Sequence, residues 1–472
     1  MDSQTATSTT QPVKAIKKPG ILINRNFALL WVGQAISFSG DVVFDTTLVL
    51  WVATQLARGQ QWTPLAVGGV FLSAVLPMFV VAPFAGVFVD SWPDKRKTML
   101  RMYSASSLLI LLLFPLTGLV PLPFLAADHL PIWWRLGAIY AITLLVGTLA
   151  QFFNPSEMAL LSDIVDEPYR ARATGLHSLT LHLAELLGPV LGAVFFFSVG
   201  IQWSLLLDAL SFVVAFLAIL SLHVPAQKSS VEEESAPEKQ GTLIGEFREG
   251  LRFFTASRIL VTLIITGVLL ELCTGTRNTL GIFFLAENLH MAARFYGFLG
   301  TAFGGGLIIG AALAGTFGQR IGFARMYWLS AVGYGLLLIL YARMTSFAPA
   351  LVVLFLQGTI NGVTEVLMIS LVIQVSGRDF VGRALSVFSP AYGLALVLST
   401  VFAGYLASIL LHGFHLTLFG IAFGPIDTIF LAIGIIAIAG GLYALVTLRG
   451  VKLTREEKHI PLLGRSGDIS PH

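Results

Sequence analysis

The chain has 472 residues, of which 56% are hydrophobic and only 12% are Asp, Glu, Lys or Arg, and its mean hydropathy is +0.82. A soluble domain carries about 25% charged residues, so this composition argues against a water-soluble fold and against a disordered protein. A single cysteine, Cys273, argues against a disulfide-stapled secreted domain. The net charge of +3 is too small to indicate a nucleic-acid partner.

Twelve apolar stretches are long enough to cross a bilayer as helices, which takes about 20 residues each. They lack the short alternating pattern of membrane β-strands, and the first is too long for the core of a signal peptide. We therefore predict an all-α membrane protein. In chain order the expected spans are 27–53, 65–89, 100–120, 132–153, 176–197, 203–222, 259–285, 296–317, 326–341, 351–375, 385–411 and 426–447.

Lys and Arg predict the orientation, because they gather in cytoplasmic loops. With the N-terminal tail inside, an even number of spans returns the C-terminus to the same side, and most basic residues become cytoplasmic. The basic residues left in the outer loops are Arg58, Arg135, Arg294 and Arg343. We expect a multi-pass protein of the cell membrane, the plasma membrane of a prokaryote, with both termini cytoplasmic.

The longest polar interval divides the spans into six plus six. Its first part is rich in Glu and reads as a solvated linker. Its second part, 244–254, places apolar residues on one helical face, which predicts either a helix on the membrane surface or an extension of the seventh span. The predicted domains are a tail 1–26, a six-helix bundle 27–222, a cytoplasmic linker 223–258, a second six-helix bundle 259–447 and a tail 448–472.

Two pairs of loops are alike across the halves. Each loop after spans two and eight begins with a glycine, has a polar residue four positions later and then carries cations. The loops after spans four and ten each contain an Arg-Ala pair. The residues concerned are Gly86, Asp90 and Lys95; Gly315, Gln319 and Arg320; Arg172 and Ala173; and Arg383 and Ala384. Such duplication is typical of transporters built from two halves.

The loop at 86–97 resembles the signature Gly-x-x-x-Asp-Arg-x-Gly-Arg-Arg between helices two and three of the major facilitator superfamily. This copy has Ser91 for the first Arg and Pro93 for the second Gly. The resemblance implies two six-helix bundles, and a latch in which the acid contacts the inner end of helix eleven in the outward-facing state. The latch residues that it implies are Gly86, Asp90, Lys95, Arg96 and Arg320.

The fifth span contains Gly188, Pro189 and Gly192, which resemble the Gly-Pro-x-x-Gly element of antiporters in that superfamily. Proline removes a helical hydrogen bond and kinks the helix, while glycine permits close approach of a neighbour. Residues 152–155 and 208–212 resemble the macrolide-efflux and enterobactin-exporter-like branch. That resemblance implies a drug exporter coupled to protons.

Ionisable residues inside the spans each need a partner, a cavity or a function, since a charge at the bilayer centre costs about 2.5–3.5 kcal/mol. Asp41 and Asp45 in span one share a helical face, and two carboxylates so close cannot both ionise easily. That property suits a proton carrier. The alternatives are hydration in the outer mouth or pairing with cations on neighbouring helices.

His182 and Glu185 share a face of span five and could pass a proton or hold one another; the alternative is a structural role. In span seven, Glu271 and Arg277 lie on roughly opposed faces, so we expect each to find a partner on another helix. Arg277 could instead reach the outer boundary and snorkel.

Span ten holds the last deep acid, Glu365, one turn after Asn361. It is a candidate for proton coupling or for lining the substrate cavity, and the alternative is a hydrogen-bonded structural carboxyl. Asp208 in span six reads as structural.

Together these features predict a secondary active transporter: a proton-coupled exporter of hydrophobic or amphipathic, macrolide-like drugs that works by alternating access. No nucleotide-binding loop and no metal-binding histidine pair occur in the sequence, so we expect no cofactor. The expected partners are a small-molecule substrate, protons and membrane lipid, and we expect a monomer. The alternatives are a siderophore or lipid exporter or an importer of the same fold, and then a membrane-embedded enzyme or a non-transporting receptor.

Overall fold

Twelve helices of the computed structural model are long and apolar enough to cross a membrane, which confirms the predicted all-α membrane fold. The structure describes residues 23–92, 94–118, 130–223, 257–418 and 421–449. The segment predicted as a surface helix, 244–254, lies outside these ranges, as do most of the two tails. A two-stranded antiparallel hairpin of β1 (Leu416–Leu418) and β2 (Ile421–Phe423) was not predicted.

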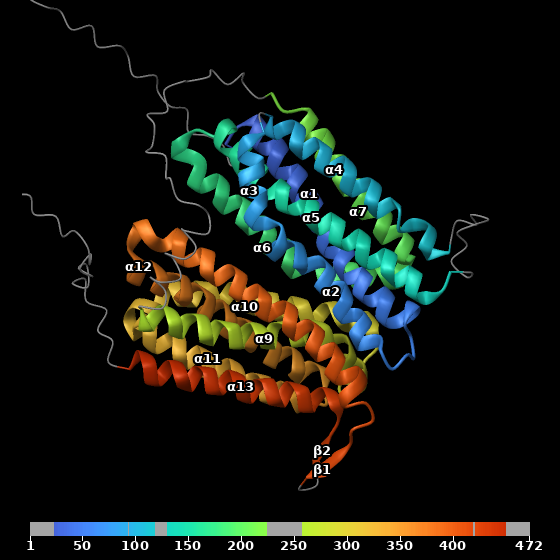
Figure 1. Cartoon of the computed structure of the whole chain (residues 1–472), viewed down its shortest axis with the longest axis vertical. Helices are drawn as coiled ribbons and strands as arrows, with labels where there is room; N and C mark the ends of the chain where they lie inside the picture. Colours follow the sequence, from blue (N-terminus) through green and yellow to red (C-terminus); the bar gives the residue numbers. More distant parts are fainter. Residues whose placement is uncertain (1–22, 93, 119–129, 224–256, 419–420, 450–472) are drawn as a thin grey trace, which may run out of the picture.

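The helices form two bundles, one from each half of the chain (Figure 1). In the figure the bundles meet near α2 and diverge toward the opposite end of the molecule. The first bundle comprises α1 (Arg25–Trp51), α2 (Thr63–Val80), α3 (Ala82–Ser91), α4 (Lys95–Leu111), α5 (Ile132–Ile164), α6 (Glu167–Val199) and α7 (Ile201–Leu220). The second comprises α9 (Arg258–Glu287), α10 (Tyr296–Ile321), α11 (Phe323–Ala342), α12 (Phe347–Tyr405) and α13 (Pro425–Leu448).

Helix α12 contains both the tenth and the eleventh predicted spans. The structure is helical throughout 376–384, where the sequence predicted a loop, and the side chains of that stretch are not described. The stretches Phe347–Val375 and Pro390–Leu410 are each apolar enough to cross a membrane. The chain therefore keeps twelve crossings although two of them belong to one helix.

Helices α10 and α12 touch through their backbones. A Cβ atom at Gly306 would lie 2.7 Å from Thr359 N and 2.9 Å from Phe355 C, and one at Gly358 would lie 2.8 Å from Phe303 C. These positions admit no side chain, and small residues of this kind allow two helices in lipid to pack at short range. Close backbone packing thus holds α10 and α12 together within the second bundle.

Helix α9 runs through the middle of the second bundle and carries the sole cysteine of the chain. Cys273 is fully buried, with its Sγ 3.4 Å from Leu269 O one turn earlier in the same helix. Hydrophobic side chains of α11 and α13, including Tyr334 and Phe430, belong to the same core cluster.

The cations after α3 cap the ends of helices. Lys95 Nζ donates to the carbonyls of Val89 and Trp92 at the end of α3, the latter at 2.8 Å. Arg96 donates to Ile219 O at 3.1 Å and Leu220 O at 2.5 Å at the end of α7. Cations at helix C-termini compensate unpaired carbonyls and the negative end of the helix dipole.

The other residues of the predicted latch are only partly described. Gly86 and Asp90 lie in the backbone of α3, and their side chains are outside the described set. Arg320 is exposed in the last turn of α10. The latch with helix eleven therefore stays a prediction.

Asp94 begins α4, and we expect Asp94→Ala to lower the free energy of unfolding by about 1 kcal/mol, as loss of an N-cap typically does. The backbone N–H of Lys97 donates to Asp94 Oδ1 at 3.0 Å, which holds the pKa of this carboxyl below its usual range. A carboxyl whose pKa is lowered in the folded state stabilises the fold at pH values above its ordinary pKa. This stabilisation is lost as the pH falls through the pKa of the folded state. Chemical unfolding of wild type and variant against pH measures both effects, and Asp94→Asn, which keeps an acceptor, should retain most of the stability.

Candidate functional site: an interbundle cavity and its buried acids

The bundles touch where α6 meets α10. Thr301 Oγ1 donates to Leu186 O at 2.5 Å. A Cβ at Gly297 would collide with the carbonyl of Pro189, and one at Gly300 would lie 3.0 Å from Pro189 Cγ. The two bundles are therefore in contact through backbone atoms where α6 meets α10, and the interface is closed at this end.

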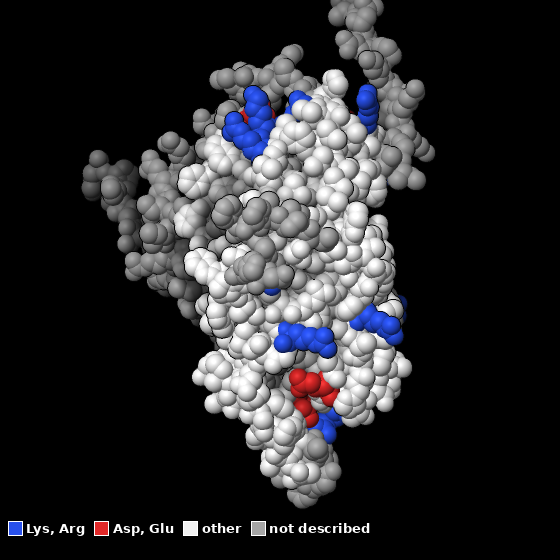
Figure 2. Space-filling model, turned by 90° about the vertical axis from the view of Figure 1, so that its right-hand side faces the viewer, with Lys and Arg blue, Asp and Glu red and all other residues white. Residues whose placement is uncertain are grey.

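A second contact joins α2 to the last turns of α12. Leu65 N donates to Ser408 Oγ at 3.1 Å, and a Cβ at Gly68 would lie 3.1 Å from Thr400 O. Figure 2 views the molecule from the right-hand side of Figure 1, and the described surface there is mostly uncharged, with only a few blue and red groups. Leu65 and Ser408 lie at the span ends that the Lys and Arg distribution assigned to the outside.

The Gly-Pro-x-x-Gly element lies at this closed end and contacts helices of both bundles. A Cβ at Gly188 would strike Val42 of α1, and one at Gly192 would lie 2.9 Å from Thr46 Cβ. Pro189, on another face of α6, contacts α10 through Gly297. The glycines thus bring α6 close to α1, while the proline meets the opposite bundle.

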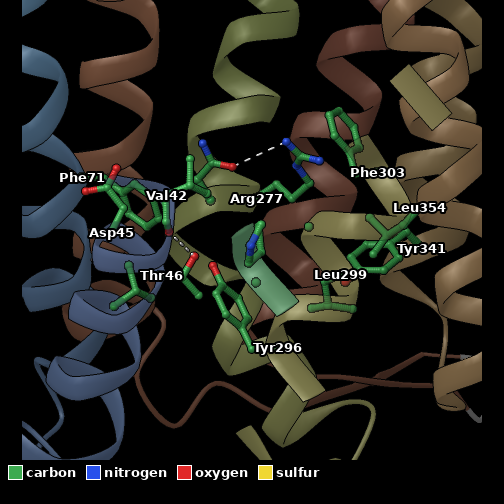
Figure 3. A pocket seen from close by; sticks show the side chains of 15 residues that line it. Val42, Asp45, Thr46, Phe71, Arg277, Tyr296, Leu299, Phe303, Tyr341 and Leu354 are labelled. Carbon is green, nitrogen blue, oxygen red and sulfur yellow. Dashed lines mark hydrogen bonds between the residues drawn. The ribbon is translucent and has the colours of Figure 1, made fainter. Parts of the chain in front are cut away.

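A cavity of about 220 Å³ lies between the bundles beside Pro189 (Figure 3). Helices α1, α2 and α6 contribute one wall and α9 to α12 the other. Most of its lining is apolar or aromatic, and Asp45 and Arg277 are the two charged residues among the described ones that line it. The lining residues used below are Asp45, Phe71, Arg277, Tyr296, Phe303 and Tyr341.

Arg277 points into this cavity from α9. Its guanidinium carbon lies 3.4 Å from the centroid of the Phe303 ring, and its Nη2 lies 3.5 Å from Asn278 Oδ1. Among the described residues no carboxylate forms an ion pair with it, and its buried Nε has no hydrogen-bond partner. The partner on another helix is thus an aromatic ring, Phe303 of α10, rather than an acid.

The two acids of α1 lie in different surroundings. Asp45 is exposed to the cavity, while Asp41, one turn earlier, is half-buried. Asp208 of α7 is completely buried within electrostatic range of both, and Ser211 Oγ donates to Asp208 O at 2.7 Å. Asp208 Oδ2 has no partner among the described residues. Three carboxyl groups therefore gather where α1 and α7 meet.

Gly40 makes this approach possible. A Cβ at Gly40 would lie 2.7 Å from Asp208 Oδ1 and would collide with Ser211 Oγ. Any larger residue would push α7 and its carboxyl away from α1.

A buried histidine–glutamate contact that the sequence did not predict joins α5 to α6. His177 Nδ1 lies 3.2 Å from Glu157 Oε1, and the Glu157 side chain is only 2% exposed. Tyr103 OH, 3.3 Å from Gln34 Oε1, extends this polar cluster across α4 and α1. The predicted fourth span ended at 153, but α5 continues to Ile164, and the span boundary therefore hid Glu157 in a supposed loop.

His182 and Glu185 form an exposed pair, with Nδ1 and Oε2 3.3 Å apart on one face of α6. Glu365 of α12 is exposed within electrostatic range of both, so the pair and this acid face each other across the two bundles. These residues lie on the diverging side of the Leu186 contact between α6 and α10.

Glu271 is half-buried in α9, within electrostatic range of Glu365 and Arg277, and makes no ion pair with a described residue. Asn361 is half-buried one turn before Glu365. Within the described ranges, no group of three or more His, Cys, Asp or Glu side chains could hold a metal ion.

Two helical bundles around an interbundle cavity are the architecture of several solved membrane transporters, whose fold this chain shares. The nucleoside transporter NupG matches with a TM-score of 0.64 at 14% identity, covering 90% of this chain and 99% of that one. The D-xylose–proton symporter matches with a TM-score of 0.63 at 12% identity, covering 92% and 99%. At such low identities these likenesses establish the fold alone.

The chain belongs to the transmembrane secretion effector family of the major facilitator superfamily, whose model matches residues 20–438. Enterobactin exporter EntS of Escherichia coli O1:K1 is 26% identical over 326 residues, which are 68% of this chain and 73% of EntS. The uncharacterized transporter YkuC of Bacillus subtilis is 25% identical over 247 residues, so the chain spans about half of that relative (53%). YfiS of Bacillus subtilis is 21% identical over 96% of this chain and 99% of its own length.

These relatives confirm the predicted superfamily and its exporter-like branch, and a multi-pass protein of the cell membrane. The family and the structural neighbours are transporters, which confirms the choice of a transporter over an enzyme.

Proposed function

We propose that the chain is a proton-coupled exporter of hydrophobic or amphipathic drugs. Its two bundles would rock about the closed contacts of α6 with α10 and α2 with α12, and both termini would be cytoplasmic. The similarity to an enterobactin exporter supports the direction of transport. The contact of α2 with α12 lies at the span ends that the Lys and Arg distribution assigns to the outside, which supports a state that is open toward the cytoplasm.

The observation that carries the proposal is the group of acids beside the interbundle space. Asp45 faces the cavity, and Asp41 and the buried carboxyl of Asp208 lie within electrostatic range of it. Neutralising one such carboxylate with a proton removes a burial penalty of a few kcal/mol. Since about 1.4 kcal/mol changes an equilibrium tenfold, one proton is enough to favour the other state of the transporter.

On the diverging side, Glu185 with His182 and the facing Glu365 offer a second place for a proton. A proton that binds the α1 acids from outside and leaves through this group would travel against the drug. Within this proposal the neighbouring carboxyls of Asp41 and Asp45 carry the proton, and Glu185 takes part in proton release.

Substrate efflux from cells tests this function. We expect Asp41→Asn and Glu185→Gln each to reduce export of a macrolide probe at least tenfold at equal protein levels, and collapse of the proton gradient to abolish export by the wild type. Asp163→Asn, which changes an exposed acid near the end of α5, is the matched control and should export normally. Normal export by both site variants would refute these assignments.

A second candidate is export of a siderophore, which the name of the enterobactin-exporting relative favours. Growth of a siderophore-producing host that lacks its own exporter, with and without this chain, would distinguish that cargo from a drug.

A further inference from the structure

We propose that the interbundle cavity binds an amphipathic zwitterion, with its anionic group at Arg277, its cationic group at Asp45 and an apolar body between them. As a statement about transported cargo this rests on the proposed function; as a statement about binding it stands on the cavity alone.

The contacts of the Arg277 side chain indicate where the anionic group of the ligand would bind. Its guanidinium carbon lies 3.4 Å from the centroid of the Phe303 ring, within the cavity wall, and it lacks an ion pair with any described carboxylate. Its Nε is buried without a partner. A buried donor with no acceptor is costly, and a guanidinium offers a planar set of donors that matches a carboxylate. An anionic ligand group at this place would supply the missing ion pair.

The cationic end follows from Asp45. This carboxyl is exposed to the same cavity from α1, and no described cation forms an ion pair with it. Figure 3 shows Asp45 and Arg277 on separate walls, with the aromatic side chains around them. Two opposite charges that share a cavity without touching can be bridged by a ligand that carries the complementary pair.

The body of the ligand follows from the rest of the lining. Phe71 lies on the side of the first bundle, and Tyr296 and Tyr341 on the side of the second. Aromatic walls of this kind bury a flat apolar ring system. The ligand would therefore combine aromatic or other apolar surface with two separated charges.

This arrangement also links the ligand to the proton. Asp45 belongs to the first bundle and Arg277 to the second, so the two ends of a bound zwitterion would contact different bundles. A proton on Asp45 removes the negative charge that the cationic end requires. Proton and ligand would thus compete at Asp45, as exchange of one for the other demands.

Norfloxacin is a suitable probe, because at neutral pH it carries a carboxylate and a protonated amine at opposite ends of an aromatic ring system. Its N-acetyl derivative keeps only the anion, and its ethyl ester keeps only the cation. Binding of all three to the purified full-length chain in neutral detergent can be followed at pH 7 without a proton gradient. We expect norfloxacin to bind at least about tenfold more tightly than either derivative, a difference of about 1.4 kcal/mol.

Two variants separate the two ends. Arg277→Gln should weaken norfloxacin and its N-acetyl derivative about tenfold and leave the ester unchanged. Asp45→Asn should weaken norfloxacin and the ester and leave the N-acetyl derivative unchanged. Arg294→Gln is the matched control, since Arg294 also lies over a phenylalanine ring, Phe295, at 5.1 Å, but is exposed and not among the residues lining the cavity.

Equal binding of the three probes would overturn the inference. So would an equal loss of all three in Arg277→Gln when the variant keeps the wild-type melting temperature. The assay measures binding without a proton gradient, so the expected preference for norfloxacin and its loss in the variants can be observed even if export does not depend on protons. The binding proposal and the export proposal can therefore fail separately.

Discussion

Gly306→Ala is expected to prevent the transporter from folding, or to lower its melting temperature by many degrees. The added methyl would meet Phe355 O, Thr359 N and Phe355 C, all of which are backbone atoms that cannot rotate away. Overpacking costs about 1–3 kcal/mol even where side chains can adjust. Here α10 and α12 would have to separate along the core of the second bundle. Size-exclusion profiles and thermal unfolding of the purified protein measure the effect.

Gly315→Ala in the same helix is the matched control. No atom lies within 4 Å of a Cβ built at Gly315. Alanine favours a helix interior by about 0.5–1 kcal/mol over glycine, so this variant should be as stable as the wild type or slightly more stable. If Gly306→Ala and Gly315→Ala gave the same melting temperature, the close packing of α10 on α12 would be refuted.

Gly297→Val is expected to leave each bundle folded but to force the bundles apart at their closed end. Its side chain would collide with the carbonyl of Pro189 and approach Val190 Cα. These atoms belong to the opposite bundle, so separation relieves the collision without breaking a core. We expect a shift of a few kcal/mol against the closed contact, comparable to other overpacked sites, and at least a tenfold loss of transport.

Hydrogen–deuterium exchange resolves this shift along the chain. In Gly297→Val the amides near Leu186 and Thr301 should exchange faster, while those of the core of α11 stay protected. Gly137→Val is the control, because it lies in open space on α5 and should alter neither exchange nor transport. Unchanged exchange at the closed end in Gly297→Val would mean that this contact does not set the conformation.

The membrane crossings were predictable because each is a long apolar run, which is recognisable even when its exact ends are misplaced. Span ends were less secure. The helix predicted to end at 153 continues to Ile164, and Glu157, which reads as a loop residue, is buried within the bundle against His177. The sequence alone does not distinguish a polar residue that is buried against a partner from one that is exposed to water.

The site was predictable only in part. Asp41, Asp45, Glu185, Glu365 and Arg277 were singled out as charges in apolar runs, and the shared face of His182 and Glu185 followed from their spacing. The grouping of Asp41 with Asp208, and the stacking of Arg277 on Phe303, depend on which helices pack together. No single-sequence pattern encodes that pairing between helices.

The burial of the sole thiol makes the native chain convenient for chemical labelling. Cys273 has no exposed surface inside α9, so maleimide and methanethiosulfonate reagents, which need access to the thiolate, should leave the folded protein unmodified. A cysteine introduced at either end of the interface would then be the single reactive position. Fluorophores or spin labels could follow the opening and closing of the two halves without first removing the natural residue.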